Sequence, residues 1–156
     1  MLVNNAGVSV FGDTLRGSVR DYEHVLSVNF LGAVHCTVEA LPFMLRRKSG
    51  RIVNISSVAG LHGVPYLAAY SASKAALGSY SETLRAELAD RGVGVMVVYP
   101  GYTDTEIFEV ERHLGGARRP PGDYTPPEFV ARALARGLER DSREVYLTLR
   151  GRALSV

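Results

Sequence analysis

The sequence predicts an α/β fold: a doubly wound parallel sheet with helices on both faces. Short apolar runs alternate with longer segments of helical periodicity, the order found in parallel sheets wound with right-handed crossovers. Three of the apolar runs, at 1–5, 51–56 and 93–99, lead directly into loops rich in Asn, Ser, Gly or Pro. The carboxyl ends of these strands are therefore expected to share one crevice at the edge of the sheet. The chain has 156 residues, of which 46% are hydrophobic, and this suits a single domain over 1–156.

The first half of the chain is expected to begin with a strand and a long helix. The strand at 1–5 is followed by a helix that Ser18 can cap, with Asp21 in the first turn, where the helix dipole favours an acid. Apolar residues then recur at helical spacing up to about residue 49. Pro42 is expected to bend the last turns of this helix.

The later elements continue the alternation of strands and helices. They are a strand at 51–56, a helix at 68–91, a strand at 93–99, an irregular stretch at 102–124 and a last strand at 144–149. A final helix is expected to precede the last strand. Thr125 can cap it, and Pro126 and Pro127 are tolerated in a first helical turn.

Composition and charge argue against several classes of function. The formal net charge is +2 and the basic residues are scattered, so no nucleic-acid partner is expected. The four histidines show no ligand spacing, so no metal site is expected. No apolar run of membrane-spanning length and no leader is recognised, so no membrane partner is expected either. The single Cys36 lies in an apolar stretch, which predicts a buried thiol, a reducing compartment and a cytoplasmic location.

Tyr70 and Lys74 are the most informative pair, because lysine is rare in this chain. Lys48 and Lys74 are the only lysines among 18 Lys and Arg residues. Residues four apart on a helix share one face. An ammonium near a phenol favours the phenolate and lowers the pKa of the tyrosine, as general acid–base chemistry requires. This spacing alone also occurs by chance in helices, so neighbouring motifs must decide its meaning.

Ser57 stands thirteen residues before Tyr70 and directly follows the apolar run at 51–56. This places Ser57 at the carboxyl edge of the sheet, where open α/β folds bind ligands. Ser56 is the competing candidate. Adjacent strand residues face opposite ways, so only one of the two serines can point into the site.

These motifs together resemble the short-chain dehydrogenase/reductase family. The matching elements occur in the family's order and spacing: Asn4-Asn5-Ala6-Gly7, Asn29 within Ser27-Val28-Asn29-Phe30, Ser57, Tyr70 with Lys74, and Pro100-Gly101 followed by Thr103 and Thr105. The resemblance runs from residue 1 to about residue 105, and the interval to Tyr70 favours Ser57 over Ser56. It implies the later two-thirds of a Rossmann-type dinucleotide-binding domain.

The family resemblance implies hydride transfer between a nicotinamide cofactor, NADP or NAD, and a small-molecule carbonyl or secondary alcohol. Tyr70 would be the general acid or base, and Ser57 would position the carbonyl oxygen. Lys74 would lower the pKa of Tyr70 and bond the nicotinamide ribose. Asn29 would hold a water that links Lys74 to solvent. A purely structural buried amide is the alternative for Asn29.

The resemblance also implies a cofactor-binding set and a substrate cover. The cofactor-binding residues are Asn5, Ala6, Gly7, Tyr70, Lys74, Pro100, Gly101, Thr103 and Thr105. In this reading Thr103 bonds the nicotinamide carboxamide through its backbone, and the Thr105 hydroxyl reaches a phosphate. Residues 106–119 would cover the substrate. The helix at 68–91 would lie at a subunit interface, so the full-length form is expected to be a homo-oligomer.

One part of the family pattern has no counterpart in this sequence. No Gly-rich phosphate-binding turn precedes Asn4, so cofactor binding is expected to be weakened, and the strand at 1–5 is expected to form an exposed sheet edge. The alternative function is therefore a truncated, non-catalytic remnant or a binding protein that keeps the scaffold. A sugar epimerase or dehydratase shares the Tyr-x-x-x-Lys spacing, but the Asn-Asn-Ala-Gly turn disfavours it.

Overall fold

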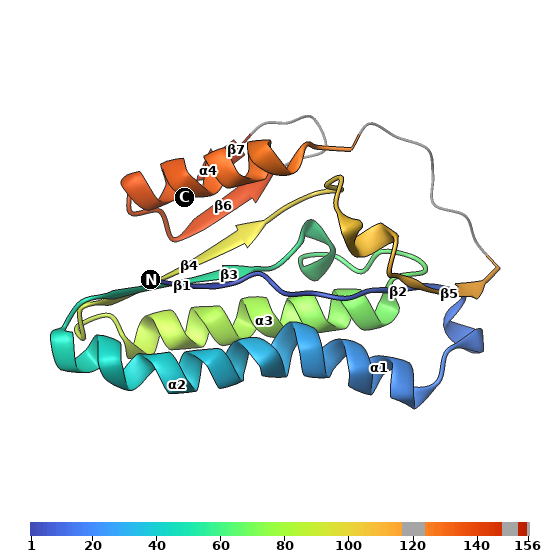
Figure 1. Cartoon of the computed structure of the whole chain (residues 1–156), viewed down its shortest axis with the longest axis horizontal. Coiled ribbons are helices and arrows are strands. Elements are labelled where there is room, and N and C mark those ends of the chain that lie inside the picture. The colour runs from blue at the N-terminus through green and yellow to red at the C-terminus, as the bar shows by residue number, and fades with distance from the viewer. Residues whose placement is uncertain (117–123, 148–152, 156) are drawn as a thin grey trace.

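A five-stranded sheet forms the centre of the protein. The computed structural model describes residues 1–116, 124–147 and 153–155. The strands lie in the order β1 (Leu2–Asn4), β3 (Gly50–Ile55), β4 (Val93–Tyr99), β6 (Glu144–Leu147) and β7 (Ala153–Ser155) (Figure 1). The first four are parallel, as predicted, and β7 joins antiparallel to β6. The predicted continuation of the last strand to Leu149 lies outside the described residues.

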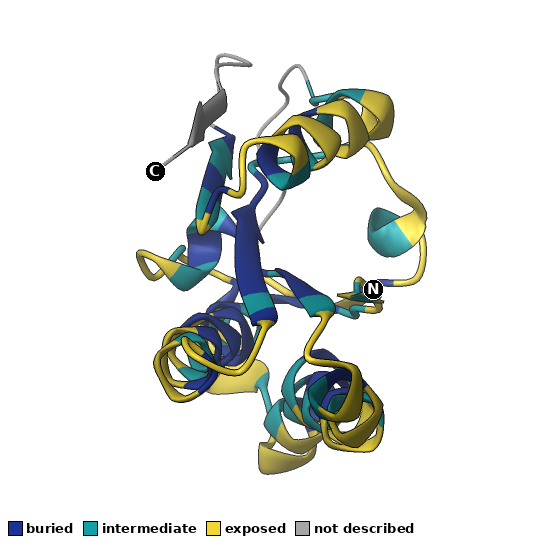
Figure 2. Cartoon of the chain, turned by 90° about the vertical axis from the view of Figure 1, so that its left-hand side faces the viewer, coloured by how far each residue is buried: buried dark blue, intermediate teal, exposed yellow. Residues whose placement is uncertain are grey.

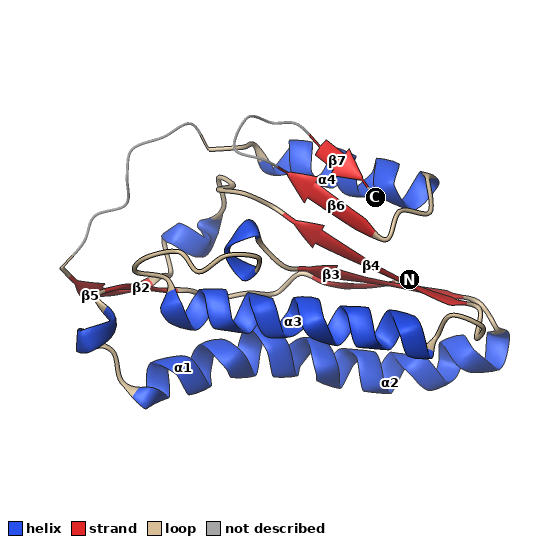
Figure 3. Cartoon of the chain, turned by 180° about the vertical axis from the view of Figure 1, so that it is seen from behind, coloured by secondary structure: helices blue, strands red, loops and turns tan. Residues whose placement is uncertain are grey.

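Helices cover both faces of the sheet, so the predicted fold class is confirmed. The helices are α1 (Val19–Leu26), α2 (Gly32–Arg47), α3 (Ala68–Glu87) and α4 (Pro127–Glu139). The first three pack on one face and α4 on the other (Figures 1 and 3). Helix α3 ends before the predicted residue 91, because the chain turns through Leu88–Gly92 and Gly92 has a φ of +72°, which favours glycine.

The N-terminal boundaries of α1 and α4 depend on different capping groups. The Asp21 carboxylate accepts hydrogen bonds from the backbone N–H and the hydroxyl of Ser18, both at 2.8 Å, so the predicted start of α1 is confirmed. The predicted cap of α4 is wrong. Pro126 occupies the capping position, because Thr125 is paired with Thr103 in a β-bridge.

Alternate residues of the central strands supply the two halves of the core. Ile52 and Val95 pack against α2 and α3, whereas Val53, Met96 and Val98 pack against α4. This alternation follows from the two-residue period of a strand and leaves both faces of β3 and β4 buried. Figure 2 shows the same pattern, with buried central strands and exposed outer helix faces.

The stretch predicted to be irregular contains regular elements. A 3₁₀ turn covers Glu106–Phe108, and a strand, β5 (Arg112–Gly115), pairs in parallel with β2 (Val10–Gly12). The sequence did not reveal this pair because each strand is only three or four residues long. The two strands stabilise each other through contacts between distant parts of the chain.

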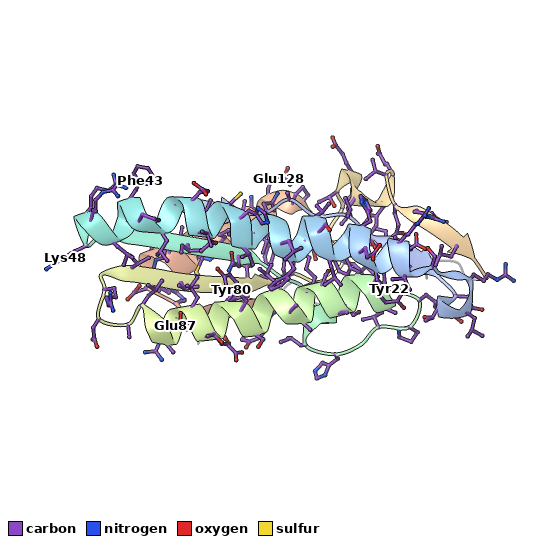
Figure 4. All side chains as sticks on the ribbon, turned by 90° about the horizontal axis from the view of Figure 1, so that it is seen from below. Tyr22, Phe43, Lys48, Tyr80, Glu87 and Glu128 are labelled. Carbon is purple, nitrogen blue, oxygen red and sulfur yellow. The ribbon has the colours of Figure 1, made fainter. Side chains whose placement is uncertain are left out.

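Two expectations about the long N-terminal helix are wrong. Cys36 is exposed rather than buried, because it lies on the side of α2 that faces away from the sheet. The expectation that no apolar run reaches membrane-spanning length is also wrong, because the helical stretch Val19–Arg47 is long and apolar enough to cross a membrane by length and composition. In this structure one side of the stretch packs on the sheet through residues such as Met44 and Leu41. Figure 4 shows Phe43 and Lys48 near the C-terminal end of α2.

Candidate active site

The carboxyl ends of β1, β3 and β4 lie at one edge of the sheet, beside the start of α3 (Figure 1). The loops after β3 and β4 are joined there, since the Val58 N–H donates to the Pro100 carbonyl at 2.9 Å. A 3₁₀ turn at Val58–Gly60 packs so tightly on α3 that a Cβ at Gly60 would lie 2.7 Å from the carbonyl carbon of Lys74. The ends of these strands therefore meet at one edge of the sheet, as the sequence predicts.

Tyr70 and Lys74 lie on the same side of α3, as their spacing predicts. The Lys74 Nζ is 5.6 Å from the centre of the Tyr70 ring. Lys74 is 3% exposed, whereas Tyr70 is half-buried. The ammonium donates a hydrogen bond of 2.8 Å to the carbonyl of Ile55, at the end of β3. A buried cation therefore lies beside a phenol that solvent reaches.

Burial strongly affects the charge of Lys74. Loss of water around the ammonium lowers the pKa of Lys74 from 10.5 to about 8. The hydrogen bond to Ile55 orients the amine but adds no negative charge. Near neutral pH Lys74 is a cation whose proton is easier to remove than that of an exposed lysine.

The two candidate serines have different environments. The Ser56 hydroxyl donates to the backbone carbonyl of Lys74 at 2.8 Å and so fastens β3 to α3. The Ser57 hydroxyl accepts from the Ala59 N–H at 3.2 Å and donates to the Pro100 carbonyl at a long 3.3 Å. Ser57 thus lies between the ends of β3 and β4 and makes the weaker of the two donor contacts.

Asn29 lies in a π-helical segment, Ser27–Leu31, between α1 and α2. Asn29 is 1% exposed, and its side chain bonds both backbone groups of Val8, in the loop after β1. The amide oxygen accepts from the Val8 N–H at 2.8 Å, and the amide nitrogen donates to the Val8 carbonyl at 2.9 Å. The nitrogen also donates to the Ser73 hydroxyl at 2.9 Å. Both amide hydrogens are therefore used, which supports the structural alternative for this side chain.

Gly7 brings the loop after β1 against the catalytic candidates. A Cβ at this position would lie 3.5 Å from both the Asn29 Oδ1 and the Lys74 Nζ. Asn5 and Ala6, the other predicted cofactor residues of this loop, are exposed. The predicted residues from β1 and α3 are therefore neighbours in space.

The loop after β4 places Pro100, Gly101 and Thr103 at the same edge. The Thr103 hydroxyl donates to the Gly101 carbonyl at 3.1 Å. In the bridge between Thr103 and Thr125, the Asp104 N–H donates to the Thr125 carbonyl and the Thr125 N–H donates to the Tyr102 carbonyl. The Thr103 N–H therefore takes no part in this bridge. Thr105 is exposed at the start of the turn Glu106–Phe108. Arg118 and Arg119, in the predicted cover, lie outside the described residues.

Sequence reasoning missed a buried polar network behind the site. The Asn4 amide donates to Asn54 at 2.7 Å and to Thr37 at 3.3 Å, and the Asn54 amide donates to Ser81 at 2.7 Å. The network links β1 and β3 to α2 and α3. Asn54 interrupts an apolar strand, and this was the available signal, because a buried amide requires partners.

Comparison with known proteins places this geometry in a family. Residues 1–114 match the family model described as short chain dehydrogenase. The chain is 37% identical over 152 residues to a Dehydrogenase/reductase SDR family protein 7-like of Anopheles gambiae, covering 94% of this chain and 48% of that protein. The chain thus spans about half the length of this curated relative.

Solved structures share the fold over nearly the whole chain. A short-chain dehydrogenase from Sphingobium yanoikuyae in complex with NADPH has a TM-score of 0.82 and 25% identity, with 93% of this chain and 56% of that chain covered. A short chain dehydrogenase/reductase from Burkholderia phymatum in complex with NAD has a TM-score of 0.81 and 28% identity, with 93% and 59% covered. The sequence match and the shared fold agree, and the chain belongs to the short-chain dehydrogenase/reductase family of oxidoreductases.

Proposed function

We propose that this chain carries the proton-transfer half of an NAD(P)-dependent oxidoreductase site that interconverts a carbonyl and a secondary alcohol. The observation that carries the proposal is the buried Lys74 ammonium 5.6 Å from the centre of the Tyr70 ring. Membership of an oxidoreductase family supports the reaction type. The structures of relatives with NADPH and with NAD support a nicotinamide cofactor.

The residues at the sheet edge fit such a cofactor. Gly7 lacks a side chain where the loop after β1 approaches Lys74, and the ammonium has donor capacity beyond its bond to Ile55. In the proposal, Asn5–Gly7 contact the adenosine side, Lys74 bonds the ribose hydroxyls, and Thr103 and Thr105 bond the carboxamide and a phosphate. When bound, the nicotinamide supplies or accepts the hydride.

The protein's own contribution is the movement of a proton. In reduction, the Tyr70 hydroxyl gives its proton to the carbonyl oxygen as negative charge develops there, and Lys74 stabilises the phenolate that remains. Ser57 donates a second hydrogen bond to the same oxygen. The Ser57 hydroxyl has a single proton, so Ser57 must first break its hydrogen bond to the Pro100 carbonyl. That bond is 3.3 Å long and therefore weak, so breaking it costs little free energy.

The role of Asn29 in a proton relay stays a prediction. Its side chain is committed to Val8 and Ser73, so the side chain positions the loop after β1, and a water would have to bond the backbone of the π segment. π-Helical segments are frequent at functional sites, which supports this placement. Homo-oligomer formation by the full-length protein and a cytoplasmic location also stay predictions.

Replacement of Tyr70 by Phe tests the proposed function. We expect Tyr70→Phe to lower the rate of cyclohexanone reduction with NADPH at least about 100-fold, because general acid catalysis is lost while the ring is kept. Tyr80→Phe is the matched control, since Tyr80 lies on the same helix but packs edge-on against Phe30, on the side facing the long N-terminal helix (Figure 4). NADPH consumption is measured for both variants and the wild type.

A second measurement separates the enzyme from a non-catalytic scaffold. NADPH fluorescence is titrated with the purified chain and with Tyr70→Phe. Binding retained in Tyr70→Phe, together with lost turnover, supports the proposal. Equal turnover in Tyr70→Phe and the wild type would refute it. A wild-type chain that neither binds NADPH nor reduces the ketone would favour the remnant.

A further inference from the structure

Ser73 lies in α3 between the two residues of the proposed acid–base pair, directly before Lys74, and it is fully buried. Its hydroxyl donates a hydrogen bond of 2.7 Å to the backbone carbonyl of Tyr70. The same hydroxyl accepts from the Asn29 amide at 2.9 Å. Ser73 therefore uses its single hydroxyl proton on the backbone of the residue that carries the proposed acid.

The Tyr70 carbonyl also belongs to the helical turn that carries Lys74. In an α-helix a carbonyl accepts from the N–H four residues later, and for Tyr70 that donor is the N–H of Lys74. The Ser73 hydroxyl is thus a second donor to this carbonyl. The Lys74 carbonyl in turn accepts from the Ser56 hydroxyl at 2.8 Å. A buried serine therefore holds the backbone of each member of the pair.

The bond from Asn29 connects Ser73 to the loop after β1, the loop that the proposed function places at the cofactor. The Asn29 side chain bonds the N–H and the carbonyl of Val8. The hydrogen bonds thus run without a break from this loop, through two side chains, to the backbone of Tyr70. Both side chains are buried, so water does not compete for these bonds.

We propose that Ser73 is a positioning residue of this site, whose hydroxyl holds the Tyr70 backbone so that the phenol stays beside the Lys74 ammonium. The inference rests on the proposed function, and Ser73 acts through Tyr70 without taking part in the proton transfer. A hydroxyl that bonds a carbonyl one turn earlier alters the local bend of a helix. Tyr70 and Lys74 stand on either side of this turn, so the hydroxyl helps to set the 5.6 Å between the Nζ and the ring centre.

Ser81 is a matched control on the same helix. It is also fully buried, and its hydroxyl donates to the Leu77 carbonyl at 2.6 Å and accepts from the Asn54 amide at 2.7 Å. Ser81 therefore makes the same kinds of bond as Ser73, about two turns further along α3. A purely structural role predicts the same behaviour for the two serines, whereas a positioning role predicts that only Ser73 affects Tyr70.

Titration of the Tyr70 phenol by ¹³C NMR tests the inference without cofactor or turnover. The ring ¹³Cζ signal is followed against pH in the wild-type chain, Ser73→Ala and Ser81→Ala. We expect the midpoint to rise by about 0.3 pH units or more in Ser73→Ala, as for charges that move about 1 Å apart. Ser81→Ala should keep the wild-type midpoint. Ser73→Thr should keep it as well, because a helical threonine can bond the carbonyl three or four residues before it.

Reduction of cyclohexanone with NADPH gives a second readout. A displaced acid should lower kcat in Ser73→Ala at least about 10-fold with KM unchanged, and Ser81→Ala should show no such loss. A wild-type midpoint in Ser73→Ala overturns the inference. An equal shift of the midpoint in Ser73→Ala and Ser81→Ala also overturns it.

The outcomes separate this inference from the proposed function. If Lys74→Met shifts the Tyr70 midpoint and Ser73→Ala does not, the inference alone fails. Full turnover in Tyr70→Phe would refute the proposed function, and the midpoints would still decide whether Ser73 positions the phenol. The NMR spectrum of each variant reports whether it is folded.

Discussion

Lys74 is the residue at which burial and function conflict most directly. An ammonium removed from water favours its neutral form, and burial lowers the pKa of Lys74 to about 8. The proposed chemistry needs the charged form beside Tyr70, and keeping that cation buried lowers the free energy of unfolding. The hydrogen bond to the Ile55 carbonyl offsets part of this cost.

Replacement of Lys74 by Met should therefore change how stability depends on pH. The folded-state pKa lies below the unfolded value of 10.5, so the unfolded chain binds more protons between about pH 8 and pH 10.5. In the wild type this group's contribution to stability rises across that window and is lost as the pH falls through 8. The gap in free energy of unfolding between Lys74→Met and the wild type should change by about 3 kcal/mol over the window.

Urea unfolding of both proteins at several pH values measures this gap. The comparison with Lys74→Met is needed because other groups titrate nearby. Burial raises the pKa of Tyr99 to about 12, so its contribution is present below pH 10 and is lost as the pH rises through 12. A gap that stays constant from pH 7 to pH 10.5 would contradict the assignment of Lys74 as a desolvated cation.

The π-helical segment between α1 and α2 is the element that positions the site. It turns Asn29 inward at the level of Val8 and Ser73, so one amide fixes both the loop after β1 and the start of α3. Gly7 precedes Val8, and its place beside Lys74 depends on this anchor. The long helix thus organises three segments that are distant in sequence.

Asn29→Ala should lower the free energy of unfolding by about 2 to 4 kcal/mol. The change removes three hydrogen bonds and leaves the part-buried N–H and carbonyl of Val8 unpaired. Asn5→Ala is the control for stability, because Asn5 is exposed and should change it by less than about 0.5 kcal/mol. Denaturant unfolding provides the comparison. Equal stability of Asn29→Ala and the wild type would show that the amide is not an anchor.

For the whole molecule, the sheet leaves β1 at its edge, paired with β3 on one side. The sequence analysis predicted that the strand at 1–5 forms such an edge, and the chain spans 48% of the relative from Anopheles gambiae. Val3 is 40% exposed on this short strand. An apolar edge of this kind is a site for pairing with another strand.

The fold could largely be predicted because long periodic segments dominate it. Strand β4 was predicted with its observed bounds, and α3 was predicted with its observed start and an end that was too late. The pairing of β2 with β5, the antiparallel β7 and the exposure of Cys36 depend on tertiary contacts that have no local pattern.

In the candidate site, too, the sequence predicted local features and missed those that depend on contacts between distant residues. Tyr70 and Lys74 were predicted as neighbours because helical spacing alone brings them together. The bonds of Asn29 to Val8 and the pairing of β2 with β5 join residues distant in sequence, so neither could be predicted from spacing.

Titration of the Tyr70 phenol tests the central claim most directly. The ring ¹³Cζ signal of Tyr70, assigned by its loss in Tyr70→Phe, is followed between about pH 6 and pH 11 in the wild type and in Lys74→Met. If the Lys74 cation stabilises the phenolate, the titration midpoint is lower in the wild type than in Lys74→Met. Equal midpoints in the two proteins would contradict the proposed coupling between the amine and the phenol.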